Sequence, residues 1–366
     1  MSIYYTDDKV VLHHGDCLDV LATLPDASVD AVVTDPPYGI GFMGKEWDSG
    51  KSFVERKAAK RNTFDHVGGN HNPTSSADAA RTRRVESARF GAWCEQWVTE
   101  CLRVLKPGRH LLAFGGTRTW HRLAVAVEDA GFEIRDNLAW LYGSGFPKSM
   151  DVSKAIDKHL DVTTPATPDA ERWAGWGTAL KPGHEPIVMA RKPLTGTVAA
   201  NVLEHGTGAL NIEACRVGDE ALPAQTAGQA QIGTFERGVM VTPARVGRWP
   251  ANVILDESQA EALDEQSGTL TSGSRKAGTH GLMGYMGADA APMPEVVGDT
   301  GGASRFFYVA KAPKSERPVV DGVAHPTVKP VSLMSWLVRL VTPPGGTVLE
   351  PSARSGTTVQ AATREG

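Results

Sequence analysis

The length and charge of the chain exclude several classes of protein before any motif is considered. The chain has 366 residues and a formal net charge of −4. It is therefore long enough for one large domain with insertions, or for two domains, and it is not basic overall. Any surface that binds nucleic acid must be local. Apolar residues make up 41% of the chain and charged residues 22%, which is ordinary for a globular protein in water.

The cysteines are widely spread, at positions 17, 94, 101 and 215, and no two of them form a Cys-x-x-Cys pair. This spacing argues against a zinc site and against the disulfide framework of a small secreted protein. Cys94 and Cys101 are seven residues apart, which places them on one helix face as small core residues. The N-terminus lacks a signal pattern, and no apolar run is long enough to span a membrane. We therefore predict a cytoplasmic protein with reduced cysteines, no membrane association and no metal.

Strands and helices alternate over the first 150 residues. The apolar patterns predict strands at 9–13, 31–33, 110–114 and 132–142. They predict helices at 17–24, 90–105 and 120–130. This alternation predicts an α/β fold with a doubly wound, mainly parallel sheet. Asp16 follows the first strand, where such sheets bind ligands. The alternative for Asp16 is a structural acid in a turn.

The most informative stretch follows the strand at 31–33 and reads Asp35-Pro36-Pro37-Tyr38-Gly39. Neither proline can donate a backbone hydrogen bond, and each restricts the residue before it, so the strand must end in a stiff turn. The turn presents one carboxylate, the Pro36 carbonyl and the flat ring of Tyr38. The two acceptors can hold an exocyclic amino group on a flat heterocycle while the ring stacks on its face. The alternative is a turn with a surface acid and a packed tyrosine.

Residues 39–89 are predicted to form a long mobile loop that leaves directly from this corner. The segment is polar, is rich in Gly, Asn and Ser, and lacks a sustained apolar period. Its basic residues form two groups, namely Arg56, Lys57, Lys60 and Arg61, and then Arg81, Arg83, Arg84 and Arg89. A solvated loop and a flap that grips DNA phosphates are both compatible with this composition.

Residues 151–320 break the alternation of strands and helices. A helix is predicted at 152–160, a strand at 185–192 that could be a reversed edge strand, and another strand at 304–310. Between the last two strands the sequence has many glycines and few periodic segments, and residues 267–302 are predicted to be mobile.

Two further motifs lie near the C-terminus. The segment His325-Pro326-Thr327-Val328-Lys329-Pro330 precedes a predicted helix at 331–340. A predicted strand at 347–349 leads into Glu350-Pro351-Ser352-Ala353-Arg354-Ser355-Gly356-Thr357-Thr358. A strand, a turn of small residues and a helix start together make a nucleotide-type site. The backbone can approach the ligand closely there, and the helix start offers free N–H groups.

In these motifs and their order, the chain resembles the amino-methyltransferases that modify adenine N6 or cytosine N4 in DNA. Asp35, Pro36, Pro37 and Tyr38 match the catalytic tetrapeptide of that family, and residues 325–330 and 355–358 match its cofactor-side motifs. The catalytic motif comes first and the cofactor loop last, as in the permuted class, and especially in its phage-like members. The resemblance implies a Rossmann-like methyltransferase sheet, S-adenosyl-L-methionine as cofactor, double-stranded DNA as partner and a setting in restriction-modification.

The resemblance also implies roles for segments and residues. Residues 1–150 would be the catalytic half, 151–320 the edge strand and target-recognition region, and 321–366 the cofactor-binding half. The loop at 143–149 would help to wall the base pocket. The implied cofactor-binding residues are Asp16, His325, Thr327, Lys329, Glu350, Pro351, Ser355, Gly356 and Thr357.

The implied reaction is direct methyl transfer to a base that is flipped out of the duplex. The base stacks on Tyr38 while Asp35 and the Pro36 carbonyl hold its amino group. Asp at position 35 favours adenine over cytosine, for which Ser is commoner in the family. The alternatives are an enzyme that acts on cytosine N4, RNA or a protein amide, and a non-catalytic DNA-binding remnant.

The cofactor loop departs from the family pattern Asp-Pro-Phe-x-Gly-Ser-Gly-Thr-Thr at three positions. Glu350 replaces Asp, Ser352 replaces Phe and Arg354 replaces Gly. A Gly at position 354 would allow a close backbone approach and a positive φ, which Arg cannot match cheaply. In relatives the chain continues beyond the helix that is expected before Gly366 and forms one more strand, which lies in the sheet between the strands that correspond to 347–349 and 9–13. The cofactor half of this chain is therefore expected to be truncated. From these differences we predict weak or absent binding of S-adenosyl-L-methionine.

Overall fold

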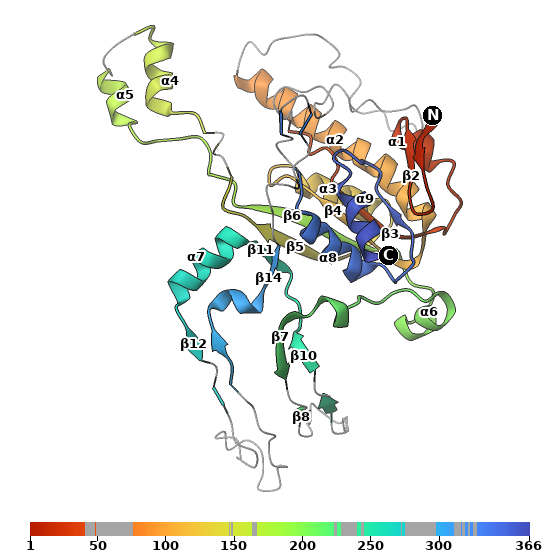
Figure 1. Cartoon of the computed structure of the whole chain (residues 1–366). Helices are drawn as coiled ribbons and strands as arrows, with labels where there is room; N and C mark the ends of the chain where they lie inside the picture. The colour runs from red at the N-terminus through yellow and green to blue at the C-terminus, as the bar shows by residue number, and fades with distance from the viewer. Residues whose placement is uncertain are drawn as a thin grey trace, which may run out of the picture.

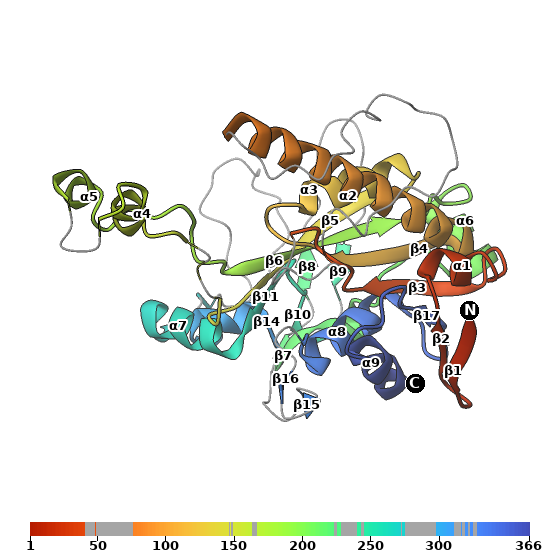
Figure 2. The same cartoon turned by 90° about the horizontal axis from the view of Figure 1, so that it is seen from above.

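Seven strands form one sheet through the middle of the molecule, with helices on both of its faces (Figures 1 and 2). The computed structural model describes residues 1–40, 48, 76–145, 147, 149–162, 167–222, 225–227, 240–242, 245–271, 273–274, 298–310, 316, 319–320, 323–324 and 328–366. Across the sheet the strands are β14 (Tyr308–Ala310), β11 (Val253–Asp256), β5 (Glu133–Leu141), β6 (His184–Arg191), β4 (Leu105–Phe114), β3 (Val29–Thr34) and β17 (Val348–Leu349).

All neighbouring strands of this sheet are parallel, except that β6 is antiparallel to β4 and to β5. The parallel strands place their carboxyl ends at one edge, where open α/β sheets bind ligands. The predicted α/β fold with a mainly parallel sheet is confirmed.

The helices lie in two layers (Figure 2). One face carries α1 (Cys17–Leu21), α2 (Ser76–Val104) and α3 (Trp120–Asp129), and the other carries α8 (Val331–Val341) and α9 (Thr357–Glu365). Successive residues of β3 point to opposite faces of the sheet. Val32 packs in the core with α2, whereas Ala31 and Val33 pack in the core with α8. Every residue of β3 is buried. This explains its nearly continuous apolar run, which is typical of a strand covered on both faces.

Helix α2 is longer than the helix predicted at 90–105. It begins at Ser76, so Arg81, Arg83, Arg84 and Arg89 are helical and do not belong to a loop. The prediction of a loop was wrong from residue 76 onward, because Ala and Arg favour a helix even where no apolar stripe marks one. The apolar stripe begins at Phe90 and continues through Cys94, Trp97, Cys101 and Val104, all of which are buried. The remainder of the predicted loop, apart from residues 39, 40 and 48, lies outside the described residues.

Strand β6 confirms the predicted reversed strand but not its place at an edge. It lies inside the sheet between β4 and β5. Residues 186–191 are buried without a break, as a strand with neighbours on both sides and cores on both faces must be. Its reversal brings its amino end, at His184 and Glu185, beside the carboxyl ends of β4 and β5.

Two other sequence predictions are also corrected. The strand predicted at 9–13 is β2 (Val11–His14), which pairs with β1 (Ser2–Thr6) in a separate hairpin and does not join the seven-stranded sheet. The strand predicted at 304–310 is a 3-10 turn, Ala303–Phe306, followed by the short strand β14. Strand β11 was not predicted, because its four residues are too few to show a period.

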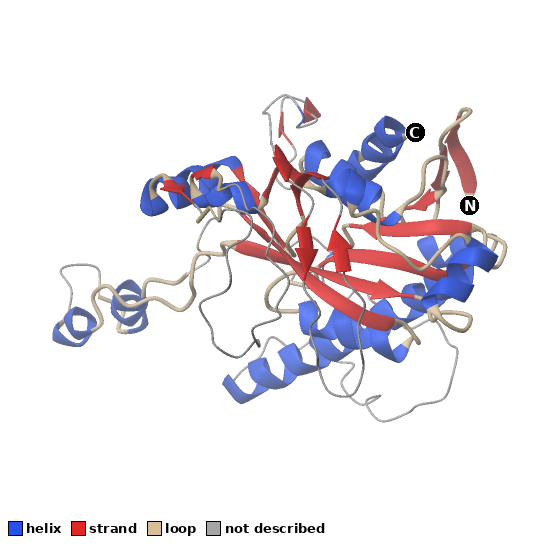
Figure 3. Ribbon diagram, turned by 90° about the horizontal axis from the view of Figure 1, so that it is seen from below, coloured by secondary structure: helices blue, strands red, loops and turns tan. Residues whose placement is uncertain are grey.

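The remaining elements lie outside the two helix layers. Helices α4 (Val152–His159) and α5 (Pro168–Arg172) project together from the body (Figures 1 and 3). The others are α6 (Val198–His205), a 3-10 turn at Glu213–Cys215, β7 (Val217–Leu222), β8 (Gln225–Ala227), β9 (Met240–Thr242), β10 (Arg245–Arg248), α7 (Glu257–Ser267), β12 (Leu270–Thr271), β13 (Thr300–Gly301), β15 (Val319–Val320) and β16 (Val323–Ala324). The sheet takes strands from all three predicted segments, and the domain boundaries at 151 and 321 stay predictions. No helix in the described part of the chain combines the length and the apolar character needed to cross a membrane.

Candidate functional site

The corner after β3 is held rigidly by its neighbours. Asp35 follows the buried end of the strand, and the Tyr38 carbonyl accepts a hydrogen bond from the Thr119 hydroxyl at 2.5 Å. Gly39 has φ +66°, and a Cβ built there would lie 2.6 Å from the ring of Phe90. Glycine is therefore required both by the backbone conformation and by the close packing. Among the described residues, no hydrogen bond reaches the carbonyl of Pro36, so it remains available as an acceptor.

Four polar side chains meet at this corner and are called here the corner cluster: Asp35, Tyr38, Glu185 and Lys329. The Tyr38 hydroxyl lies 2.8 Å from Oδ1 of Asp35 and 2.9 Å from Oε2 of Glu185. The Lys329 ammonium lies 3.0 Å from Oδ2 of Asp35, 3.0 Å from Oε2 of Glu185 and 3.1 Å from the Tyr38 oxygen. Residues from the corner after β3, from β6 and from the segment before α8 thus converge at the carboxyl edge of the sheet.

The corner cluster holds its protons tightly. Burial raises the pKa of Tyr38 well above its usual value, and the two neighbouring carboxylates raise it further, so the hydroxyl stays protonated. Burial lowers the pKa of Lys329, but Asp35 and Glu185 outweigh this effect and leave that pKa above its usual range. Lys329 is therefore a charged ammonium at neutral pH. With both carboxylates ionised, the cluster carries a formal charge of −1, which favours a cationic ligand beside it.

Glu185 was not predicted as a site residue. It lies in a His-Glu-Pro segment that carries no motif by itself, and its place depends on β6 being antiparallel and inside the sheet. The signal that could have found it is the sequence Ile187-Val188-Met189-Ala190, whose continuous apolar character indicates an interior strand.

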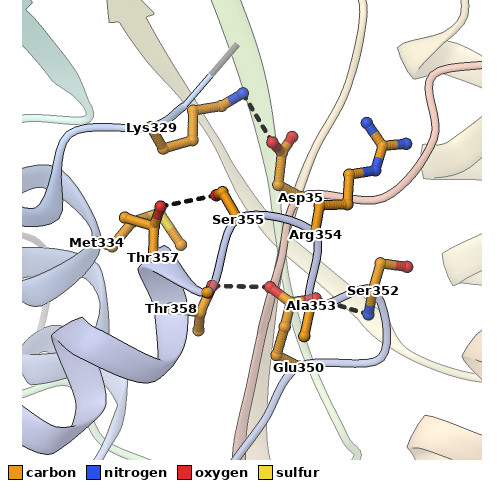
Figure 4. A pocket seen from close by; sticks show the side chains of 11 residues that line it. Asp35, Lys329, Met334, Glu350, Ser352, Ala353, Arg354, Ser355, Thr357 and Thr358 are labelled. Carbon is orange, nitrogen blue, oxygen red and sulfur yellow. Dashed lines mark hydrogen bonds and ion pairs between the residues drawn. The ribbon is translucent and has the colours of Figure 1, made fainter. Parts of the chain in front are cut away.

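A second feature adjoins the corner cluster, where β17 leads into the loop at 350–358 and then into α9. A pocket is formed there (Figure 4) by Asp35, Lys329, Met334, Glu350, Ser352, Ala353, Arg354, Ser355, Gly356, Thr357 and Thr358. Gly356 has φ +70°, and a Cβ added there would meet nothing within 4 Å. The first turn of α9 has no side-chain cap. Its N–H groups and the partial positive charge of the helix start can therefore receive an anionic group.

Glu350 joins the corner to this loop. Its carboxyl group accepts hydrogen bonds from the Thr34 hydroxyl at 2.5 Å, the Thr358 hydroxyl at 2.7 Å and the Ser352 N–H at 2.9 Å. Two of these contacts are visible in Figure 4. Burial raises the pKa of Glu350 to about 7, against the opposing effect of these hydrogen bonds, and the nearby charge of Asp35 raises it further. The end of β3 and the start of α9 are thus tied through one carboxyl group.

Arg354 occupies its position without backbone strain. Among the described residues, the non-glycine residues with positive φ are Ala27 and Asp161, and Arg354 is not one of them. The expectation that Arg would pay for a positive φ here was wrong, because the residue of this loop with positive φ is Gly356. The remaining cost is the side chain itself, which lines the same pocket as Asp35 (Figure 4).

The other predicted site residues lie in different places. Asp16 caps α1 by accepting a hydrogen bond from the Leu18 N–H at 2.9 Å, and neither it nor Pro351 is among the residues that line the pocket. Lys329 was predicted on the cofactor side, and the structure places its ammonium in the corner cluster as well as at the pocket. His325 and Thr327 lie outside the described residues, as do Phe146 and Lys148 of the 143–149 loop.

Comparison with known proteins gives a consistent result. A family model described as DNA methylase matches residues 29–366. The type II methyltransferase M.HindIII of Haemophilus influenzae is 30% identical over 213 residues, which are 55% of this chain and 64% of that protein. M.HinfI of Haemophilus influenzae is 24% identical over 140 residues, which are 34% of this chain and 30% of that protein. The chain thus spans less than two thirds of the length of these relatives.

Two solved structures align with most of the chain at lower sequence identity. The PvuII DNA methyltransferase, described as cytosine-N4-specific, aligns with a TM-score of 0.45 and 13% identity, covering 99% of this chain and 81% of that one. A protein from Thermus thermophilus, described as a DNA modification methylase, aligns with a TM-score of 0.37 and 17% identity, covering 96% of this chain and 83% of that one.

Proposed function

Since the chain belongs to the DNA methylase family, we propose that it transfers a methyl group from S-adenosyl-L-methionine to the exocyclic amino group of a DNA base, namely adenine N6. The observation that carries this proposal is the contact between the two halves of the site. The Asp-Pro-Pro-Tyr corner follows β3, the 350–358 loop follows β17, and these two strands are parallel neighbours. Asp35 consequently lines the same pocket as Gly356 and Thr357, so an acceptor and a methyl donor would meet directly.

The residues around the pocket fit the charges of the proposed cofactor. The uncapped start of α9 suits the carboxylate of its amino-acid part. The carboxylate of Asp35 and the net negative corner cluster suit its sulfonium. Bound there, the cofactor supplies an electrophilic methyl group. This chain contributes the orientation of the acceptor nitrogen and the electrostatic environment.

The corner supplies what a flipped base requires. Oδ2 of Asp35 and the carbonyl of Pro36 can each accept one N–H of the amino group, and the Tyr38 ring can stack on the base. When both N–H bonds are held out of the ring plane, the nitrogen lone pair is released from the ring and becomes nucleophilic. We propose double-stranded DNA as the substrate and residues 151–320 as the region that reads the target, with restriction-modification as the biological setting.

Asp at position 35 favours adenine over cytosine by resemblance to the family. It also argues against a protein amide as the acceptor, for which Asn is expected. One observation favours a second candidate, a non-catalytic DNA-binding remnant. Arg354 lines the pocket where the family has Gly, and its side chain takes space that a cofactor would use.

One experiment separates these candidates. The purified chain is incubated with S-adenosyl-L-methionine labelled in the methyl group and with unmethylated DNA of mixed sequence, and the DNA is digested to nucleosides. Labelled N6-methyladenine supports the proposal, whereas labelled N4-methylcytosine corrects the base. DNA that binds the chain but takes up no label indicates the non-catalytic remnant. The Asp35→Asn variant is the matched control, and it should lose at least about a hundredfold in rate if Asp35 holds the amino group.

A further inference from the structure

Lys329 binds the same carboxylate oxygen that the target amino group would need. The lysine ammonium has three N–H donors, and the corner cluster offers it three acceptors: Oδ2 of Asp35, Oε2 of Glu185 and the Tyr38 oxygen. Under the proposed function, the target amino group must also donate to Asp35. A carboxylate oxygen can accept two hydrogen bonds, but an oxygen that is already bonded to an ammonium is a weaker acceptor, so the lysine lowers the affinity of Asp35 for the target amino group.

Lys329 cannot readily leave the cluster. Its side chain is 6% exposed, and the ammonium lies 5.5 Å from the centre of the Tyr38 ring and 5.0 Å from that of Phe114. A buried charge without a carboxylate partner is costly. When Asp35 turns to the substrate, the ammonium keeps a second carboxylate, Glu185, at the same distance of 3.0 Å.

Glu185 is held in place for this purpose by the sheet. It lies near the amino end of β6, opposite Trp140 of β5. Glu185 is paired with β5, and the carbonyl of the next residue, Pro186, accepts a hydrogen bond from the Gly115 N–H at 2.9 Å, so the backbone here is fixed relative to the carboxyl edge of the sheet where Asp35 lies. The Tyr38 hydroxyl lies between the two carboxylates and can donate its single proton to either of them.

We propose that Glu185 is a positioning residue for methyl transfer, which retains the Lys329 ammonium when the target amino group takes over Oδ2 of Asp35. This inference rests on the proposed function. Glu185 does not touch the reacting atoms, and it acts through Lys329 by leaving Asp35 free to accept. Lys329 in turn keeps the two carboxylates from repelling each other while no base is bound.

The inference predicts an unusual pattern in a double-mutant cycle. In Glu185→Gln, Lys329 has Asp35 as its single carboxylate partner in the cluster and holds it against the substrate. The KM for DNA should then rise about ten- to a hundredfold, with a smaller change in kcat. In Glu185→Gln/Lys329→Met the competing ammonium is gone, so the KM for DNA, measured at saturating S-adenosyl-L-methionine, should return most of the way to the wild-type value. Glu185→Asp keeps a shorter carboxylate and should lie between wild type and Glu185→Gln.

The control variant is Glu133→Gln. It removes a different ion pair, between Oε2 of Glu133 on β5 and Nη2 of Arg191 at the far end of β6, at 2.5 Å. Its KM should stay within about twofold of wild type even if it loses stability. Thermal unfolding of each variant shows whether it is folded. If Glu185→Gln does not fold, the KM for DNA is compared between wild type and Glu185→Asp.

The outcomes are distinct. A KM that rises in Glu185→Gln and recovers in the double variant supports the inference. If the KM for DNA of the double variant is as high as that of Glu185→Gln or higher, the role of Glu185 is structural and the inference is overturned. The proposed function still stands in that case, provided that wild type labels DNA. Wild-type protein that labels no DNA overturns the proposed function, and the inference with it.

Discussion

Replacing Glu350 with Gln should remove a pH dependence of folding stability that this carboxyl group imposes. Its pKa is raised from an ordinary 4.5 to about 7, first because it is buried and also because Asp35 is near. Below pH 4.5 the group is protonated in both the folded and the unfolded chain, and the stability it contributes is fully present. As the pH rises through 7 the folded chain must ionise it at a cost, and that stability is lost.

The magnitude follows from the shift. A rise of about 2.5 pKa units at 1.36 kcal/mol per unit corresponds to about 3 kcal/mol, which is an upper value because the pocket is open to solvent. Gln has nearly the same size and keeps an acceptor oxygen for the Thr34 hydroxyl or the Ser352 N–H, but it does not titrate. Relative to Glu350→Gln, the wild type should therefore lose up to about 3 kcal/mol of unfolding free energy between pH 4.5 and pH 8.

Urea unfolding of both proteins at intervals across this range measures the difference directly. Histidines and other titrating groups are common to both proteins and cancel. Glu95→Gln, on the exposed side of α2, is the control for the general effect of replacing Glu with Gln. A constant difference between wild type and Glu350→Gln would refute the reasoning, because it would mean that the carboxyl group has the same pKa in both states.

Two further predictions concern binding and the core. In calorimetry, wild type should bind S-adenosyl-L-methionine with a dissociation constant weaker than micromolar, whereas Arg354→Gly should bind at least about tenfold more tightly because the pocket loses a long side chain. Arg364→Ala on α9 is the control, and micromolar binding by wild type would contradict the prediction. Asp30→Asn should cost about 3–5 kcal/mol in urea unfolding at pH 7, because it leaves the buried Arg109 without its carboxylate at 2.7 Å. Burial raises the pKa of Asp30, but hydrogen bonds from Lys106 and Thr347 and the charge of Arg109 outweigh burial and lower that pKa. The loss of unfolding free energy in Asp30→Asn should therefore shrink as the pH falls toward the acid range. A loss that is independent of pH would contradict the ion-pair explanation.

Much of the site could be predicted from local sequence because local chemistry decides it. Two prolines after an apolar strand force a stiff turn whatever surrounds them, and Asp35 and Tyr38 are where that turn puts them. The small-residue turn before α9 likewise follows from the chain itself, although local reasoning assigned the positive φ to position 354 when it belongs to Gly356.

Other features depend on contacts between residues far apart in the chain. Glu185 joins the site because β6 runs antiparallel inside the sheet, and the ammonium of Lys329 reaches Asp35 across 294 positions of sequence. Helix α2 begins at Ser76 although no apolar period marks its first turns. The amino-acid sequence by itself thus determined the α/β class, the corner and the cofactor loop, since each depends on neighbouring residues. Only the tertiary structure decided which charges face Asp35, because that depends on the order and direction of strands from distant segments.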